Sequence, residues 1–381
     1  MSAPGSTASL RTANQHRVVE AIRAGNELSQ AEISRLTELA PATVSNIVRV
    51  LSTAGFLEQT AGAGRRGATV RIARSAGLVA GVDFGHSHVQ VSLGDLAGQV
   101  IATKLRPLDN DHAHEDGLDL ARTLLDGLLA KQPSTHGPIR AVGVGLPAPI
   151  GRGGVIDSGS ILPGWVGVQA AEAATKAFGV PTIADNDANL GALAESRVGA
   201  GVGVSSMVYI KIASGVGAGI VLDGRVYRGG FGTAGEIGHM TMDENGPLCR
   251  CGSRGCLEAY VGGSSLVKQL ESLQPDITMV GLVELARAED VGARRLIEDA
   301  GRYLGRAVAI VANLIGPEII VVGGDLATAG DLLLDGVGDG LRRYALEPVE
   351  REIRVTRAAL GDQSSAVGTI LLALDAVELP S

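Results

Sequence analysis

The run Gly235-Glu-Ile-Gly-His-Met240, followed by Cys249-Arg-Cys-Gly-Ser-Arg-Gly-Cys-Leu-Glu258, is the stretch that decides the fold of this chain. These two runs hold all three cysteines of the 381 residues, together with a histidine shortly before them. Three thiolates and one imidazole form a closed tetrahedral ligand set, which is typical of structural rather than catalytic zinc. A disulfide would leave one thiol over, and the Cys-x-Cys spacing disfavours it. The sequence therefore predicts a structural Zn²⁺ ion bound by His239, Cys249, Cys251 and Cys256.

The composition is that of a globular protein with two or three domains. Apolar residues make up 45% of the chain, and aromatic residues only 3%. The most apolar window, 307–324, is interrupted by Asn313 and Glu318, so we expect no membrane span. The N-terminus lacks a basic segment followed by an apolar one, which is the pattern of a signal peptide. We expect a cytoplasmic protein.

The charge is unevenly distributed along the chain. The net charge is −8, but residues 1–75 carry nine Arg, no Lys and five Glu, which gives +4 there and −12 in the remainder. A basic N-terminal segment on an acidic body suggests contact with a polyanion.

Residues 10–75 carry the pattern of a helix-turn-helix. Ser29-Gln-Ala-Glu32 is a capping box that begins a short helix, with Ile33 and Leu36 on its apolar face. Pro41 suits the first position of the next helix, which ends before Gly55. Helical spacing predicts these inward-facing residues: Val18, Val19 and Ile22 in a first helix, and Val44, Ile47, Val48 and Leu51 in the last.

The opposite face of that last helix is polar. Its outward side chains suit the reading of base edges in a DNA major groove. They are Thr43, Ser45, Asn46 and Arg49.

Two short strands, 56–58 and 70–72, flank the glycine-rich run Ala61-Gly-Ala-Gly-Arg-Arg-Gly67. A hairpin tip carrying Arg65 and Arg66 suits a wing that places guanidinium groups on phosphates or in the minor groove. The alternative is a helical protein-docking module with a solvated basic loop. The helix pair, the wing and the positive charge together favour binding to double-stranded DNA.

The rest of the chain contains two similar units of a strand, a glycine-rich turn and a hairpin. In the first, the strand 80–85 ends in Asp83 and Gly85. In the second, the strand 206–212 is followed by a glycine-rich turn over 214–219 and a hairpin with an Asp-Gly turn. Such a pair suggests a duplicated two-lobed fold with a nucleotide between the turns, since glycine lets backbone amides approach phosphate oxygens. Each run alone is also compatible with an ordinary tight turn.

Val180-Pro-Thr-Ile-Ala-Asp-Asn-Asp-Ala-Asn189 is predicted to end a strand and begin a helix. Asp185, Asn186 and Asp187 then stand at the helix N-terminus, which favours negative charge. Simple N-capping by one Asx residue is the alternative. Two carboxylates and two amides in five residues exceed what a cap requires.

Taken together, these motifs resemble the ROK family (repressors, open reading frames and sugar kinases), and residues 10–75 resemble the winged helix-turn-helix of its repressor branch. The resemblance covers nearly the whole chain. It rests on Val82–Gly85, Gly143–Pro147, Gly164-Trp165, Asp185–Asn189, Ser214–Gly217, Gly235–His239, Cys249–Glu258 and the set Asn313, Pro317-Glu318 and Gly323-Gly324. The fold class that it implies is α/β, with an N-terminal winged helix-turn-helix and a two-lobed, actin-like ATPase body of the ROK sugar-kinase type.

The resemblance also implies roles for individual residues. In kinase members, the residue matching Asp187 would be the general base that takes the proton from the attacking hydroxyl, and the glycine turns with Mg²⁺ would hold ATP. The residues that would hydrogen-bond sugar hydroxyls are Asn186, Asp187, Glu236, His239 and Glu258. The remnants of the nucleotide loops are Asp83, Gly85, Ser87, Ser214, Gly215, Gly217, Gly323 and Gly324.

The first phosphate loop departs from the kinase pattern Asp-x-Gly-Gly-Thr. It has His86 in place of the second glycine, and this side chain should crowd the phosphates. The second turn begins Ala213-Ser214 where kinases usually have Gly-Thr. We therefore expect a sugar sensor that has lost, or nearly lost, phosphoryl transfer, with ATP and Mg²⁺ bound only if kinase activity is retained. The alternative is an ATP-dependent hexose kinase with an appended DNA-binding head. A zinc hydrolase is excluded because four protein ligands leave no open coordination position.

These observations predict a sugar-responsive DNA-binding regulator, most simply a repressor. Its partners would be a pseudo-palindromic operator and a sugar or sugar-phosphate effector, and it would act as a homodimer or a dimer of dimers. The expected domains are the head over 10–75, a first lobe over 78–190 with 365–381, and a second lobe over 191–364 that holds the zinc motif and sugar-site residues.

Overall fold

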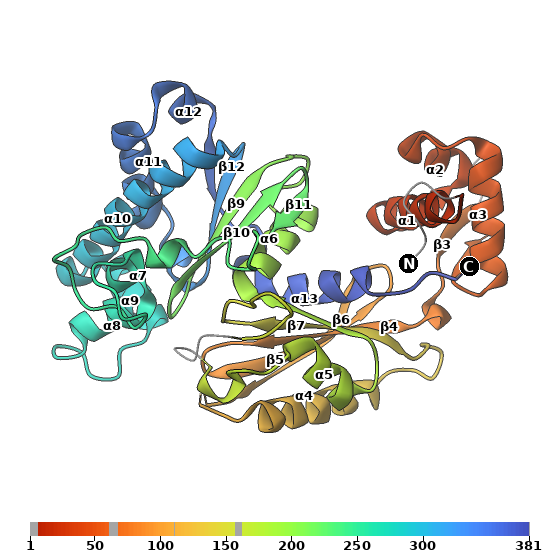
Figure 1. Cartoon of the computed structure of the whole chain (residues 1–381), viewed down its shortest axis with the longest axis horizontal. Helices are drawn as coiled ribbons and strands as arrows, with labels where there is room; N and C mark the ends of the chain where they lie inside the picture. Colours follow the sequence, from red (N-terminus) through yellow and green to blue (C-terminus); the bar gives the residue numbers. More distant parts are fainter. Residues whose placement is uncertain (1–6, 61–67, 110, 157–161, 381) are drawn as a thin grey trace.

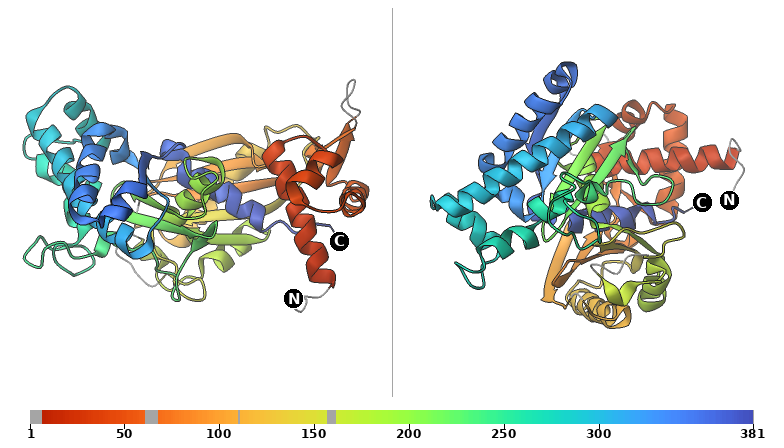
Figure 2. Two further views of the ribbon diagram at one scale, coloured as in Figure 1. Left: turned by 90° about the horizontal axis from the view of Figure 1, so that it is seen from above. Right: turned by 60° about the vertical axis from the view of Figure 1, so that its left-hand side comes forward.

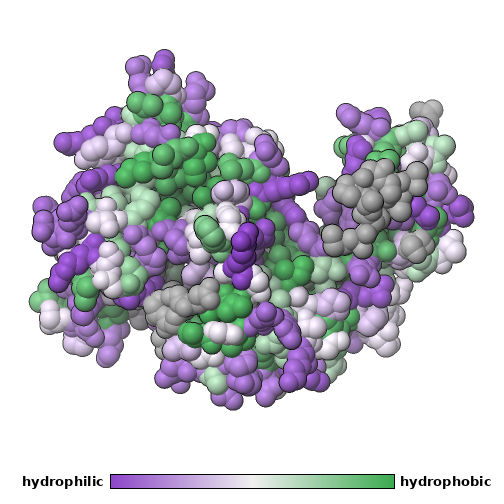
Figure 3. Space-filling model, viewed as in Figure 1, coloured by the Kyte–Doolittle hydropathy of each residue, from purple (hydrophilic) through white to green (hydrophobic). Residues whose placement is uncertain are grey.

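The computed structural model describes residues 7–60, 68–109, 111–156 and 162–380. Its elements build one three-stranded sheet and two five-stranded sheets (Figures 1 and 2). The three-stranded sheet and the first three helices form the head, which stands to one side of the body. Figure 3 shows a deep notch between the head and the upper part of the body on this face.

The head is a winged-helix unit with strand order β1-β3-β2. The predicted capping box is present, because the Ser29 N–H donates to the Glu32 carboxylate at 2.8 Å and the Ser29 hydroxyl accepts from the Glu32 N–H at 3.3 Å. Pro41 is the first residue of α3, as expected. The elements are α1 (Thr7–Gly25), β1 (Leu28–Ser29), α2 (Gln30–Thr37), α3 (Pro41–Thr53), β2 (Leu57–Thr60) and β3 (Thr69–Ile72).

The inward-facing residues predicted for the head are confirmed except at one position. All of the inward residues predicted for α1 and α3 are buried, as is Ile33 of α2. The prediction for Leu36 was wrong, because its side chain is 65% exposed. Thr37 takes the inward position instead, one turn after Ile33, and its hydroxyl donates to the Ile33 carbonyl oxygen at 2.6 Å.

The first five-stranded sheet has the order β6-β5-β4-β7-β8. Its central strand β4 alternates, because Ala80 and Val82 face the helices α4 and α5 while Val79 faces the side covered by α13. Close packing of α13 requires glycine in β7, since a Cβ at Gly143 would lie 2.0 Å from the Thr369 carbonyl oxygen. The elements are β4 (Leu78–Phe84), β5 (His88–Asp95), β6 (Val100–Pro107), α4 (His114–Leu129), β7 (Ile139–Leu146), α5 (Ala170–Phe178), β8 (Thr182–Asn186) and α13 (Ser364–Asp375).

The second five-stranded sheet has the order β11-β10-β9-β12-β13 and is covered by a large helical layer. Helix α6 packs against β9 and β10 and also against α13, so it joins the two halves of the body (Figure 1). The elements are α6 (Asp187–Val198), β9 (Met207–Ile212), β10 (Val216–Leu222), β11 (Arg225–Tyr227), α7 (Leu257–Val261), α8 (Gly263–Leu270), α9 (Met279–Arg287), α10 (Val291–Ile315), β12 (Ile319–Gly323), α11 (Asp331–Tyr344), α12 (Glu347–Glu352) and β13 (Arg354–Arg357).

The glycine-rich run after β9 is not one long turn. Ser214 and Gly215 form the connection, whereas Gly217 and Gly219 lie inside β10. The reason is packing against α6, since a Cβ at Gly219 would lie 2.4 Å from the Ala188 carbonyl oxygen. The Asp-Gly hairpin turn that follows is as predicted, with both central residues at positive φ.

No helix in the described parts of the chain combines the length and the apolar character needed to cross a bilayer.

Candidate functional site

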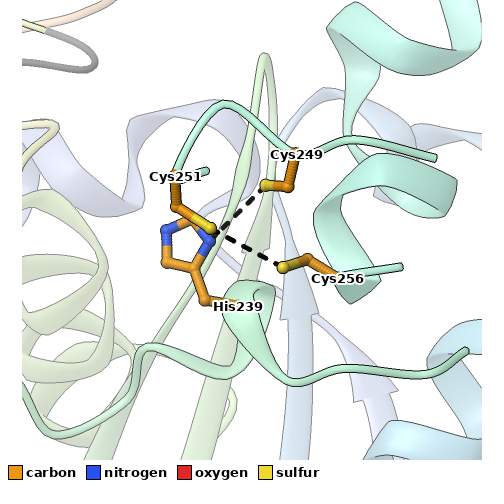
Figure 4. Close-up of side chains that lie close together, drawn as sticks. All are labelled: His239, Cys249, Cys251 and Cys256. Atoms are coloured by element: carbon orange, nitrogen blue, oxygen red, sulfur yellow. Dashed lines mark hydrogen bonds between the residues drawn. The ribbon is translucent and has the colours of Figure 1, made fainter. Parts of the chain in front are cut away.

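The loop between β11 and α7 gathers the histidine and the three cysteines into one cluster. The candidate ligand atoms of His239, Cys249, Cys251 and Cys256 all lie within 4.8 Å of one another (Figure 4). All three cysteines are free, so the alternative of a disulfide is not realised.

The cluster has the dimensions of a tetrahedral metal site. Metal–sulfur bonds of about 2.3 Å give sulfur–sulfur edges of about 3.8 Å. The Cys251 and Cys256 sulfur atoms are 3.7 Å apart, and the Cys249 sulfur lies 3.8 Å from His239 Nδ1. The residues therefore fit a metal with thiolate and imidazole ligands.

The same loop carries two carboxylates into a neighbouring cavity. Glu236 precedes His239 by three residues, and Glu236 Oε2 lies 3.9 Å from His239 Nε2, the ring nitrogen that does not face Cys249. Glu258 follows Cys256 by two residues, and one of its oxygens lies 3.9 Å from the Cys249 sulfur. Holding the cluster together thus positions both carboxylates.

This cavity has a volume of about 230 Å³. Its walls bring together every residue that was expected to bind sugar hydroxyls, from β8, α6, η3 (Ile237–His239) and α7. Those residues are Asn186, Asp187, Glu236, His239 and Glu258, and they are joined by Lys211 and Arg250.

Glu258 is held by three donors. Arg250 donates through Nε at 2.7 Å to one carboxylate oxygen and through a terminal nitrogen at 2.6 Å to the other. The Val216 N–H donates to Glu258 Oε2 at 3.0 Å. This clamp explains the glycine at position 215, because a Cβ on Gly215 would lie 2.2 Å from the Arg250 guanidinium. Gly215 thus has a reason to be glycine that does not involve a phosphate.

Asn186 serves as the N-cap of α6. Its side-chain oxygen accepts from the N–H of Ala188 at 2.9 Å, and its amide nitrogen donates to the Ala148 carbonyl at 3.2 Å. The capping role that the sequence offered as an alternative is therefore present, and Asn186 fills it. Asp185 is engaged by Arg228 at 2.8 Å, so Asp187 is the carboxylate of this run that lines the cavity.

Asp187 is paired with a buried lysine. Lys211 Nζ donates to Asp187 Oδ2 at 2.8 Å and to the Ser365 hydroxyl at 3.0 Å. The Ser365 hydroxyl in turn donates to the Asp187 carbonyl oxygen at 3.1 Å. Lys211 was not predicted from the sequence, although a lysine in the apolar strand Met-Val-Tyr-Ile-Lys-Ile was an available signal.

A second cavity of about 340 Å³ adjoins the first. It is lined by five of the expected nucleotide-loop residues: Asp83, Gly85, Ser87, Ser214 and Gly324. Gly215 and Gly217 line the first cavity instead. Gly323 packs against a side chain, since a Cβ there would lie 2.4 Å from the Tyr209 hydroxyl.

The first loop of this second cavity is crowded by histidines. The His88 ring lies over Gly85, where a Cβ would be 2.3 Å from it, and His86 also lines the cavity. Burial is the main cause that lowers the pKa of both histidines. Within the described residues, Asp83 Oδ1 and His86 Nδ1 are buried without a hydrogen-bond partner. Each of these two atoms could therefore form a hydrogen bond with a ligand or with solvent.

The expected DNA-contacting residues of α3 lie on one face of that helix. Ser45, Asn46 and Arg49 are exposed and Thr43 is half-buried. Arg49 donates to the Asn46 side-chain oxygen at 2.7 Å, which holds the two side chains together on the surface. Arg65 and Arg66 lie outside the described residues.

Comparison with known proteins identifies two family matches. A model of the ROK family matches residues 79–376, and a model of the MarR family matches residues 11–67. The chain is similar to the xylose repressor of Bacillus subtilis strain 168, with 25% identity over 96% of both chains. It is also similar to the glucokinase of Halalkalibacterium halodurans, with 33% identity over 76% of this chain and 92% of the other. The crystal structure of a ROK family transcriptional regulator, a homologue of the E. coli Mlc protein, has 26% identity and a TM-score of 0.82 over 97% of this chain and 96% of its own.

Asp83 should make the stability of the protein depend on pH. Burial raises the pKa of Asp83 to about 6 from an ordinary 3.8, so the folded state binds its proton more tightly than the unfolded state. The free energy of unfolding should therefore fall by about 3 kcal/mol as pH rises from 4 to above 6. Asp83→Asn should remove this fall, as measured by urea unfolding followed by circular dichroism. Asp335→Asn, at an exposed carboxylate of α11, serves as the control, and an unchanged pH slope in Asp83→Asn would contradict the assignment.

Proposed function

The chain belongs to the ROK family, and from that premise we propose that it is a sugar-responsive, DNA-binding transcriptional regulator that acts as a repressor. The observation that carries the proposal is the extent of the likeness. The repressor relative is matched over 96% of both chains, head included, whereas the glucokinase is matched over 76% of this chain. The exposed polar face of α3 gives that head a surface suited to a major groove.

We propose that the first cavity is the effector site. Sugar hydroxyls need several acceptors in fixed positions, and Asp187, Glu236 and Glu258 supply three carboxylates to the wall of one small cavity. Burial and the neighbouring Asp187 and Glu258 carboxylates raise the pKa of Glu236 to about 7. Glu236 can therefore accept or donate a hydrogen bond near neutral pH. The His239 Nε2 atom and the Asn186 amide would complete the set.

We propose Zn²⁺ as the metal of the cluster, because three thiolates with one imidazole in a tetrahedral arrangement is the ligand set of structural zinc. When bound, the ion would close the loop and hold Glu236 and Glu258 in register. It would take no part in chemistry, since all four positions are filled by protein.

Phosphoryl transfer is the second candidate function, and the glucokinase relative gives the specific reason to test it. Two features favour regulation instead. The Lys211 ammonium donates a hydrogen bond to Asp187, the carboxylate that a kinase would use as its general base. In addition, histidines crowd the loop that would hold phosphates. ATP and Mg²⁺ belong to this chain only if that activity remains.

Helix α13 offers a direct route from the effector site to the head. Its first turn carries Ser365, which contacts both Lys211 and Asp187. Beyond its other end, about 18 Å away, Val377 is buried in the same hydrophobic cluster as the head core. Gln15 of α1 donates to the Pro380 carbonyl oxygen at 3.2 Å. Figures 1 and 2 show α13 within the body and the C-terminal segment after it running to the head.

We propose that effector binding shifts α13 relative to the head and thereby changes operator affinity. Two heads of a homodimer or dimer of dimers would meet adjacent major grooves of a pseudo-palindromic operator. They would use Thr43, Ser45, Asn46, Arg49, Arg65 and Arg66. A coupling free energy of about 1–3 kcal/mol would change operator affinity about 5–150-fold. We retain 10–75, 78–190 with 365–381, and 191–364 as the functional units.

Two substitutions should separate the activities of the head and the body. Glu236→Ala should leave operator binding intact and abolish its response to sugar, because one acceptor of the effector site is lost. Asn46→Ala should weaken operator recognition and leave sugar affinity unchanged. Operator binding by fluorescence anisotropy and sugar binding by calorimetry would measure both. Normal sugar affinity in Glu236→Ala would show that the effector site is elsewhere.

Loss of the metal should weaken sugar binding and leave operator binding by the head unchanged. Purified protein should contain one zinc ion per chain by elemental analysis. Cys256→Ser should lose that zinc and bind sugar about 10–100-fold more weakly, because the carboxylates on either side of the loop lose their positions. Ser253→Ala, in the same loop, is the matched control. Full sugar affinity in a zinc-free Cys256→Ser protein would refute the positioning role.

The α13 route predicts an uncoupled variant. Val377→Asp should place a charge in the junction between α13 and the head and reduce the sugar-induced change in operator affinity to less than about twofold. Sugar affinity itself should persist. Val291→Asp, at a valine that is 82% exposed, is the control. A full response in Val377→Asp would exclude α13 as the route.

A further inference from the structure

Lys211 lies in the wall that the two cavities share. Its side chain lines both, as does that of Asp187, to which it is bonded. The side chains of this ion pair are only 20% and 14% exposed. Lys211 comes from β9 and Asp187 from the start of α6, so the pair also ties together two elements at the centre of the body.

The charges that face the two cavities are strongly unbalanced. Six carboxylates line them: Asp83, Asp187, Glu236, Glu258, Asp325 and Asp362. The lysine and arginine side chains in the described walls are Lys211 and Arg250. Negative charge therefore predominates, even when Glu236, whose pKa is raised to about 7, is protonated.

Both basic side chains are already engaged. Arg250 donates to both oxygens of Glu258, and Lys211 donates to Asp187 and Ser365. Desolvation, together with the nearby Arg250 or Lys211 charge, lowers the pKa of His86 and His88 and so disfavours the charged form of both rings. His239 turns Nδ1 toward the thiols. Among the described wall residues, no cation is left over to receive an anionic ligand.

The excess of carboxylates in the cavity walls disfavours the binding of a phosphate ester. Such a group carries about 1.5 to 2 negative charges near neutral pH. A phosphate that extended past Asp187 into the second cavity would also meet Asp83, Asp325 and Asp362. Like charges placed together at a binding site disfavour binding strongly. Hydroxyl groups meet the opposite situation, because each one can donate to a carboxylate oxygen.

We propose that the effector site selects an uncharged, unphosphorylated sugar and that Lys211 is a specificity-determining residue of that selection. Its ammonium group holds the Asp187 carboxylate in place as an acceptor for a sugar hydroxyl, and it does so without offering a free cation to phosphate. This inference rests on the proposed function, since it names the chemical class of the effector for the same site.

The test compares matched pairs on the full-length, zinc-containing protein. Calorimetry would measure glucose against glucose 6-phosphate, xylose against xylose 5-phosphate, and N-acetylglucosamine against its 6-phosphate. The free sugar that binds should do so at least about 100-fold more tightly than its ester. An ester that binds as tightly as its free sugar, or more tightly, would overturn the selectivity while leaving a sugar-responsive regulator in place. If none of the six compounds bound, the proposed function and this inference would both be overturned.

Lys211→Met tests the role of the lysine itself. The variant keeps the length of the side chain and removes its charge, so Asp187 loses its partner. Free-sugar affinity should fall at least about tenfold, and a circular-dichroism spectrum like that of the wild type should report an intact fold. Lys268→Met, at an exposed lysine of α8, is the matched control. Free-sugar affinity within twofold of wild type, or a loss confined to the esters, would refute the role assigned to Lys211.

Discussion

The closing of one loop around a histidine and three cysteines is the constraint on which the proposed effector site depends. The carboxylates of Glu236 and Glu258 stand at opposite ends of that loop, next to the first and last cluster residues, His239 and Cys256. Short loop segments with many glycines do not hold two carboxylates in place by themselves, because their conformational entropy is high. A four-residue cluster of this kind removes that freedom, and the Arg250 clamp on Glu258 removes what remains.

The electrostatics of the cleft support the proposal that this kinase-like body senses a sugar. A transferring site must bring an anionic phosphate next to its base. Here the side chain of Lys211 is bonded to Asp187, and His86 and His88 crowd the adjoining loop. Binding remains possible, because hydroxyl groups require acceptors and the walls are rich in carboxylates. Helix α13 begins at this ion pair and leads to the head core, so the same residues that hold Asp187 also contact the element that reaches the DNA-binding unit.

Much of the site could be predicted from local sequence. The Cys-x-Cys run, the capping box at Ser29 and the polar face of α3 are local patterns whose spacing carries their geometry. Leu36 was predicted wrongly because a three-residue step and a four-residue step from Ile33 are both compatible with an amphipathic helix, and only packing against α1 distinguishes them. The glycines at 217 and 219 were assigned to a turn, although they lie in a strand that passes close to α6.

The sequence by itself determined the family, the cluster residues and the carboxylates of the cleft, because each stands in a short motif with its own chemistry. Only the tertiary structure decided which charges are engaged. Lys211 and Asp187 come from different elements, and only the packing of β9 against α6 brings them together. Arg250 and Glu258 belong to one loop, and they meet because of the path that the folded loop takes. The continuity of α13 with the head core likewise joins the last residues of the chain to the first helix. Contacts of this kind follow from the packing of whole layers, which no local pattern records.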